Sequence, residues 1–321
     1  MKIIPKFLLV VSASLALLAN VGAYTDVTIV GGTFNSGPFK GQSVATFKVG
    51  DKETTLTDWN AGIVNAAALK FDISTPTAGG ASFPVENVSW YDAVKWCNLA
   101  SINDAKTPVY QTSSIPVSSV NRTSTTATAT TSSPHGLSTG NHVTIAGASP
   151  AGYNLTAAIT VVTPTTFTYT VNGSLTTHAN GTITAGVIYK TGEVFPNVNA
   201  SANGYRLPTE KEWQWAAIGG TNQNTFVYSG SNTANTVAWS RTNSPTGAKA
   251  VGTKTANTRD LYDLSGNVFE WVFDEVPGVV GRRVHGGGWV VDADSCQISI
   301  RGYSAASRQE LGFGFRVFQN N

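Results

Sequence analysis

Two carboxylates flank a glycine turn in the stretch DLYDLSGNVFEW, which covers residues 260–271. Asp263 comes before the turn and Glu270 after it, and the bulky aromatic residues Phe269 and Trp271 stand beside Glu270. A carboxylate buried among aromatic side chains needs a cation or hydrogen-bond donors, because it loses its hydration there. The stretch therefore indicates either a bound cation or two carboxylates held by hydrogen bonds and ion pairs.

The chain has two cysteines, Cys97 and Cys296, which are the other residues that could do chemistry. Their spacing does not decide between a disulfide and two buried thiols. Cys97 shares a face with Ala93 and Ala100 in the segment SWYDAVKWCNLAS. We therefore expect Cys97 to be a core thiol and not a reactive one.

Two helices must position these groups. Ser89 followed by Asp92 resembles a capping box, and Thr209 with Glu212 in PTEKEWQWAAIGG forms a standard one. Side chains in such boxes satisfy backbone N–H groups at the start of a helix, so we expect a structural role for all four. Beyond residue 220 only short apolar segments occur between Gly, Asn and Ser turns.

The middle of the chain differs in composition, because Arg122 is its only charged residue between 107 and 189. Alternating β-branched segments after residue 140 predict a small all-β module inserted at 115–186, with turns at two Asn-Gly pairs, 172–173 and 180–181. We expect the stretch NRTSTTATATTSSP, 121–134, to be a disordered linker. Three histidines of this module match no metal-binding spacing and are expected at the surface or in turns: His135, His142 and His178.

The N-terminus and the overall charge limit where this protein acts. Residues 1–23 have the basic start, apolar run and small residues of a secretory signal peptide, the alternative being a retained membrane anchor. The apolar run is short for a membrane span, so we expect an exported protein that is secreted, periplasmic or on the cell surface. Charged residues make up 12% with a net charge of +2 and no basic stripe, which argues against nucleic acid as a partner.

Several motifs in order resemble the formylglycine-generating enzyme, or sulfatase-modifying factor, family. They are VENVSWYDAVKWCN, GYRLPTEKEWQWAAIGG, DLYDLSGNVFEW, RVHGGGW and GFGFRVF, with FKVGDKETTLTDW as a degraded opening strand and first helix. The resemblance implies an α+β, modified C-type lectin fold with two main helices, short twisted antiparallel sheets and much irregular chain. This domain would occupy 24–114 and 187–321, interrupted by the β module.

The resemblance also implies a structural calcium ion at the 263–270 turn. Asp263 and Glu270 would supply carboxylate oxygens, and three backbone carbonyls would complete the shell: those of Ser265, Gly266 and Val268. Calcium prefers such oxygen ligands. The alternative is that both carboxylates accept backbone N–H bonds or pair with Arg206 or Arg316.

The resemblance does not extend to the family's redox chemistry. Members oxidise a cysteine of a sulfatase with copper held by two cysteines five positions apart, since soft thiolates suit Cu(I). In GGGWVVDADSCQISIRGY those positions fall at Val291 and Cys296. One thiolate cannot form the two-sulfur site, so the sequence argues against copper. The family's disulfide partner for Cys97 falls at Val317, so that bridge is absent.

Lectin-fold relatives use the segment corresponding to 289–310 as a ligand-binding face. Here its candidate contacts are one indole, one phenol and three charged groups: Trp289, Tyr303, Asp292, Asp294 and Arg301. Core packing is the alternative for Trp289, and a structural ion pair is the alternative for Arg301. The partner would be an unidentified protein or glycan.

Two functions follow. The first is an exported, non-catalytic binding or scaffold protein stabilised by calcium. The second is an oxidase, either formylglycine-generating or a diverged thiol oxidase that acts through Cys296 on a sulfatase-type protein.

Overall fold

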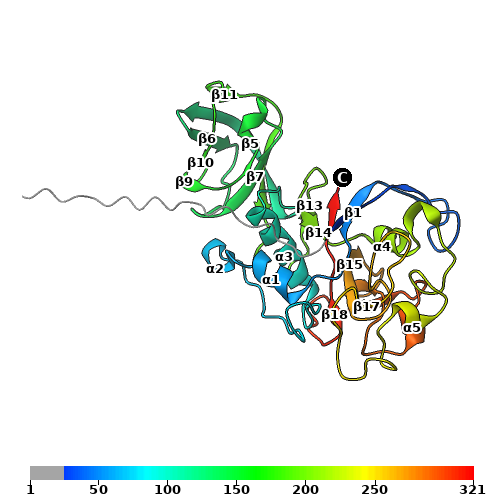
Figure 1. Cartoon of the computed structure of the whole chain (residues 1–321). Helices are drawn as coiled ribbons and strands as arrows, with labels where there is room; N and C mark the ends of the chain where they lie inside the picture. The colour runs from blue at the N-terminus through cyan, green and yellow to red at the C-terminus, as the bar shows by residue number, and fades with distance from the viewer. Residues whose placement is uncertain (1–24) are drawn as a thin grey trace, which may run out of the picture.

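The computed structural model describes residues 25–321, so the predicted signal peptide lies outside the described residues. Figure 1 shows a body of helices, short sheets and long loops, and a separate module of strands that projects from it. This is the predicted α+β fold with an all-β insertion. Within residues 25–321, every helix is too short or too polar to cross a membrane.

The two predicted main helices are α3 (Trp90–Asn103) and α4 (Glu210–Ala217). At the start of α3 the Ser89 hydroxyl accepts a hydrogen bond from the Asp92 N–H, and at α4 Thr209 and Glu212 form the full capping box. Both predicted caps are therefore confirmed. They are local features in which a side chain bonds the backbone three residues away.

The body also contains two four-stranded sheets and a short ribbon. The first sheet joins both ends of the described chain in the order β1 (Asp26–Ile29), β4 (Phe47–Gly50), β19 (Phe318–Asn320) and β14 (Tyr205–Arg206). The second has the order β17 (Gly302–Ser304), β16 (Arg282–His285), β15 (Phe269–Glu275) and β18 (Phe313–Gly314), with β15 and β18 parallel. The ribbon pairs β2 (Gly32–Thr33) with β3 (Ser43–Val44).

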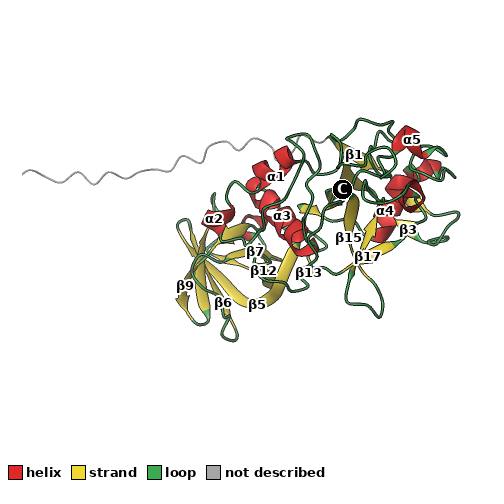
Figure 2. Cartoon of the chain, turned by 90° about the horizontal axis from the view of Figure 1, so that it is seen from below, coloured by secondary structure: helices red, strands yellow, loops and turns green. Residues whose placement is uncertain are grey.

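Three short helices complete the body. The helix α1 (Leu56–Gly62) follows β4, as the sequence predicts for the opening strand and first helix, and is capped by Thr55 and Asp58. The others are α2 (Ala66–Leu69) and α5 (Ala234–Val237). Single 3-10 turns are η2 (Gly220–Asn222) and η3 (Ala293–Cys296) in the body and η1 (Ala151–Tyr153) in the module. As Figure 2 shows, the labelled α helices lie in the body, while the module is built mainly of strands.

The module is a sheet that closes on itself. Its strand order is β8 (Thr156–Ala158), β7 (His142–Ala146), β12 (Ile183–Ile188), β5 (Tyr110–Thr123), β6 (Thr126–Thr131), β10 (Thr166–Thr170) and β9 (Thr160–Thr163), while β11 (His178–Ala179) and β13 (Asn197–Val198) also pair with β5. The two ends of this order, β8 and β9, are separated in the chain only by Ile159. The segment 156–163 thus runs from one end of the sheet to the other, pairing with β7 through β8 and with β10 through β9.

The structure corrects the prediction of a disordered linker at 121–134. Residues Thr126–Thr131 form β6, which pairs with both β5 and β10, and the side chains of Ala127 and Ala129 are fully buried. Threonine is β-branched and favours strands, and alanine fills the narrow space inside a small barrel. The predicted boundaries 115 and 186 fall within β5 and β12.

Two further expectations about the module are wrong. Gly173 and Gly181 have positive φ angles, as turn glycines do, but neither Asn-Gly pair closes a hairpin, because β10 pairs with β6 and β9 while β11 and β12 pair with β5. His178 is exposed, as expected, whereas His135 lies in an irregular segment that is not a turn and is not at the surface. It is buried against the edge of Phe167, and its ring accepts a hydrogen bond from the Leu137 N–H.

Candidate functional site

The two cysteines lie in different hydrophobic clusters and are both free thiols. Cys97 lies in the main core with Val317, the residue at the position of the family's disulfide partner. Burial raises the pKa of the Cys97 thiol far above its ordinary value. The prediction of a core thiol is confirmed, because Cys97 is fully buried on α3.

Cys296 ends the 3-10 turn η3 and is fully buried, packed with Tyr228, Val237, Ala238 and, at the edge of this cluster, Val291. Val291 thus packs against the hydrophobic cluster that contains Cys296. Burial raises the pKa of Cys296 to about 11, so the thiol is protonated at neutral pH. A protonated, buried thiol is neither a good nucleophile nor a good metal ligand.

The five residues of the predicted ligand face have different surroundings. Asp292 and Asp294 are exposed around η3, and Asp292 lies 3.6 Å from the guanidinium of Arg241. Tyr303 is exposed on β17. Arg301 forms two hydrogen bonds of 2.6 Å to the carboxylate of Glu210, which is the ion pair considered as its alternative role.

Glu210 binds several cationic or polar groups at once. Its carboxylate also lies 3.1 Å from Nε2 of His285, a ring that stacks on Trp213. Burial alone would raise the pKa of Glu210, but the hydrogen bonds from His285 and Arg301 outweigh it and lower the pKa from 4.5 to about 2. Arg301 is therefore engaged in holding a buried carboxylate.

Trp289 borders a cavity that the sequence did not reveal. Its indole N–H donates a 2.7 Å hydrogen bond to Oε2 of Glu86, and the backbone N–H of Gly312 donates a 2.5 Å bond to the same oxygen. The cavity has a volume of about 410 Å³ and is lined by both side chains together with Phe83, Lys249 and Leu311. In the sequence, this cavity could have been suspected from Glu86, which stands among apolar residues in SFPVENVSW.

The carboxylates of the 263–270 turn belong to a buried network. Glu270 and Arg316 are both fully buried, and their side chains approach to 2.7 Å. The other oxygen of Glu270 accepts a 2.8 Å hydrogen bond from the indole of Trp213. The ion pair with Arg316 is thus present, whereas Arg206 pairs with Glu212 instead.

Two more carboxylates share this network. Glu53, which the sequence analysis missed, is fully buried and accepts hydrogen bonds from the Asn267 side chain and the Val268 N–H. Asp263 accepts a 2.6 Å bond from the Gly252 N–H, but its Oδ1 is buried without a partner among the described residues. Burial raises the pKa of Asp263 to about 6, and burial together with Asp263 and Glu270 raises that of Glu53.

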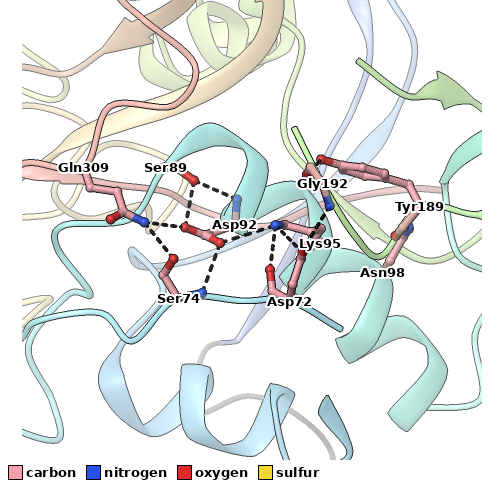
Figure 3. Close-up of polar contacts among 9 residues, drawn as sticks. All are labelled: Asp72, Ser74, Ser89, Asp92, Lys95, Asn98, Tyr189, Gly192 and Gln309. Atoms are coloured by element: carbon pink, nitrogen blue, oxygen red, sulfur yellow. Dashed lines mark hydrogen bonds and ion pairs between the residues drawn. The ribbon is translucent and has the colours of Figure 1, made fainter. Parts of the chain in front are cut away.

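A second polar cavity, of about 410 Å³, lies where the module rejoins the body. Figure 3 shows its network, in which the ammonium of Lys95 contacts both the backbone carbonyl and Oδ1 of Asp72 at 2.6 Å. The other oxygen of Asp72 accepts the Gly192 N–H just beyond β12, and Asp92 accepts bonds from Ser89, Ser74 and Gln309. The charges satisfy one another, so this network joins module to body.

Comparison with known proteins gives three findings. A family model for the sulfatase-modifying factor enzyme 1-like domain matches residues 19–321. The chain is 27% identical over 296 residues to chaperone protein LppX of Paenibacillus barcinonensis, covering 84% of this chain and 83% of that protein.

Two solved structures share the fold. The crystal structure of CarF superposes with a TM-score of 0.63 at 21% identity, covering 93% of this chain and 98% of that one. Treponema denticola variable protein 1 superposes with a TM-score of 0.57 at 22% identity, covering 93% and 95%. At these identities the likeness concerns the fold alone.

Proposed function

The chain belongs to the sulfatase-modifying factor family, and from this premise we propose that it is an exported, non-catalytic binding or scaffold protein. The observation that carries the proposal is the pair Val291 and Cys296, which occupy one hydrophobic cluster where the family's copper would need two thiolates. The remaining thiol is buried and protonated at neutral pH. The only other cysteine, Cys97, lies in a different cluster.

A polypeptide is the partner we favour. The relative of 27% identity carries the name of a chaperone protein, and this supports a protein client for the present chain. The exposed residues around η3, together with Trp289 and Tyr303, would form the contact surface. Their mixture of aromatic and charged groups suits a protein or glycan surface.

Copper binding distinguishes this function from the oxidase. We expect the mature protein to show no tight one-to-one binding in a Cu(I) titration. Introducing the second thiol with V291C should create such binding, because residue 291 packs against the cluster that contains Cys296, whereas the matched V291S should not. Tight binding by the unmodified protein that is lost in C296A would favour the oxidase and overturn the proposal.

We also propose that the 263–270 turn holds a structural calcium ion. Asp263 fits this role, because its Oδ1 is buried without a protein partner and Glu53 and Glu270 add negative charge nearby. The carbonyls of Ser265, Gly266 and Val268 would add oxygen ligands. Calcium would share Glu270 with Arg316, whose guanidinium already binds both oxygens of that carboxylate.

The calcium proposal has a direct test. An ion that binds only the native state stabilises that state. A chelator should therefore lower the melting temperature, and added calcium should restore the original value. Metal analysis of the purified protein should find about one calcium per chain, in keeping with a single such turn. A melting temperature that does not respond to chelator, together with a metal-free protein, would remove calcium from the proposal.

Export is tested at the N-terminus. Cleavage after Ala23 predicts that the protein recovered from outside the cytoplasm begins at Tyr24. N-terminal sequencing or intact mass measurement reads this directly. Recovery of the full chain beginning at Met1 from the membrane fraction would instead indicate a retained anchor.

A further inference from the structure

The cavity beside Trp289 is lined by two groups of opposite charge, Glu86 and Lys249, and by several apolar side chains. Glu86 is only 5% exposed, and its Oε2 holds the Trp289 and Gly312 N–H groups. Its Oε1 accepts no hydrogen bond from residues 25–321 and is open to solvent in the cavity that Glu86 lines. This oxygen is therefore available to a hydrogen-bond donor that enters the cavity.

Lys249 lines the same cavity from another loop. Its backbone is fixed by two hydrogen bonds with the side chain of Asn267. Its ammonium forms no ion pair within 4.0 Å, with Glu86 or with any other residue in 25–321. The cavity therefore offers one anionic and one cationic group that are held apart.

The remaining walls combine apolar residues with two threonines, Thr77 and Thr246. Phe83, Trp289 and the exposed Leu311 supply aromatic and aliphatic surface, with Ala78 and Ala248 between them. At Gly247 an added Cβ atom would meet nothing within 4 Å, so the cavity is open on that side. A volume of about 410 Å³ is in the range of small-molecule sites.

We propose that this cavity binds a zwitterion of the α-amino-acid class with an apolar side chain. Glu86 would accept hydrogen bonds from the ligand's ammonium group, Lys249 would pair with its carboxylate, and Phe83 with Trp289 would pack against its side chain. The inference deepens the proposed binding function, on which it rests, by naming a ligand class at the Trp289 end of the face. Trp289 then has two roles, because its indole also orients Glu86.

Calorimetric titration of the mature protein with the proteinogenic L-amino acids tests the proposal. We expect binding of apolar members, and we expect the matching amine without a carboxylate and the matching acid without an ammonium to bind at least about tenfold more weakly. E86Q keeps an acceptor for Trp289 and should weaken binding by at least about tenfold, as should K249M. The exposed lysine at position 40 gives the control K40M, which should bind as the unmodified protein does.

Two results would overturn the proposal. One is the absence of binding by any amino acid to protein whose melting temperature shows that it is folded. The other is an amine that binds as tightly as its amino acid, since Lys249 would then play no part. Neither result affects the copper titration, so the proposed non-catalytic function is judged separately.

Discussion

Arg316 should be the residue whose loss costs this fold most. Its guanidinium is fully buried and donates to Glu270 at 2.7 Å, to the Gly50 carbonyl at 3.0 Å and to the Tyr262 carbonyl at 2.6 Å. It is also the cation that lowers the pKa of both Glu53 and Asp263. Replacement by methionine, R316M, would keep most of the volume and remove the positive charge that Glu53, Asp263 and Glu270 share.

The expected loss is large compared with the stability of a domain. Removing one partner of a buried ion pair costs about 3–5 kcal/mol, and each carbonyl left without a donor adds about 1 kcal/mol. With the two carbonyls of Gly50 and Tyr262 the total is about 5–7 kcal/mol, which is a third or more of the stability of a typical native protein. At about 2 °C per kcal/mol for a chain of this size, the melting temperature should fall by about 10–14 °C.

Urea unfolding at pH 7 measures this loss directly through the transition midpoint. The control is R241M, because Arg241 is exposed and only 3.6 Å from Asp292, and such a surface pair contributes about 0–1 kcal/mol. Both proteins should be measured with a chelator, so that a bound cation does not offset the missing guanidinium. An R316M midpoint equal to that of R241M would refute the reasoning.

The pH dependence provides a second check on the same variant. Without Arg316 the pKa values of Glu53 and Asp263 should rise further, since the guanidinium lowers both. A carboxyl group whose pKa is raised in the folded state destabilises the fold at high pH, and this cost disappears as pH falls and the group is protonated. The difference between R316M and the unmodified protein should therefore shrink between pH 7 and pH 5. A constant difference would show that the carboxylates are not the cause.

Three further predictions concern other buried groups. The pKa of Glu210 is lowered from 4.5 to about 2, so its ion pair should stabilise the fold above pH 4.5 and lose this effect as the pH falls to 2. E210Q should remove that part of the acid dependence, which is measured as melting temperature against pH. K95M should cost about 2 kcal/mol in urea unfolding, because the buried ammonium binds Asp72 by charge-assisted bonds; a change within error would show that this network does not hold the module. Cys296 should react with a thiol reagent at pH 8 only after unfolding, since burial raises its pKa to about 11; rapid labelling of the native protein would contradict the buried position.

Local patterns predicted the helices because the decisive contacts are local. The caps of α3 and α4 each join residues three positions apart, so they are visible in the sequence. The strand order of the module is not visible in the sequence, because it depends on β5 pairing with β12 more than 60 residues later. The strand β6 was missed for a related reason, since Thr and Ala carry little hydrophobic signal and Ala127 and Ala129 are core residues only because Phe167 of β10 pairs with that strand.

The candidate site could likewise be predicted only where its residues are close in the sequence. Asp263 and Glu270 could be singled out because they lie seven positions apart across one turn, and Arg316 was among the partners considered. Glu53 could not, because it reaches Asn267 across 214 residues of sequence. Glu86 lies in a recognised motif, but its role depends on Trp289, 203 residues away. Long-range contacts of this kind carry no periodic signal in a single sequence.

The geometry around Cys296 gives its side chain a packing role. Gly287 has a φ of +69°, and a Cβ atom added there would lie 2.7 Å from Sγ of Cys296. The thiol therefore fills the space left by a glycine turn that also leads into Trp289. Cysteine behaves as a small hydrophobe in such a position, and Val291 completes the apolar wall beside it. Packing alone is thus a sufficient reason for a cysteine at position 296, and the same turn leads into Trp289, which lines the Glu86 cavity.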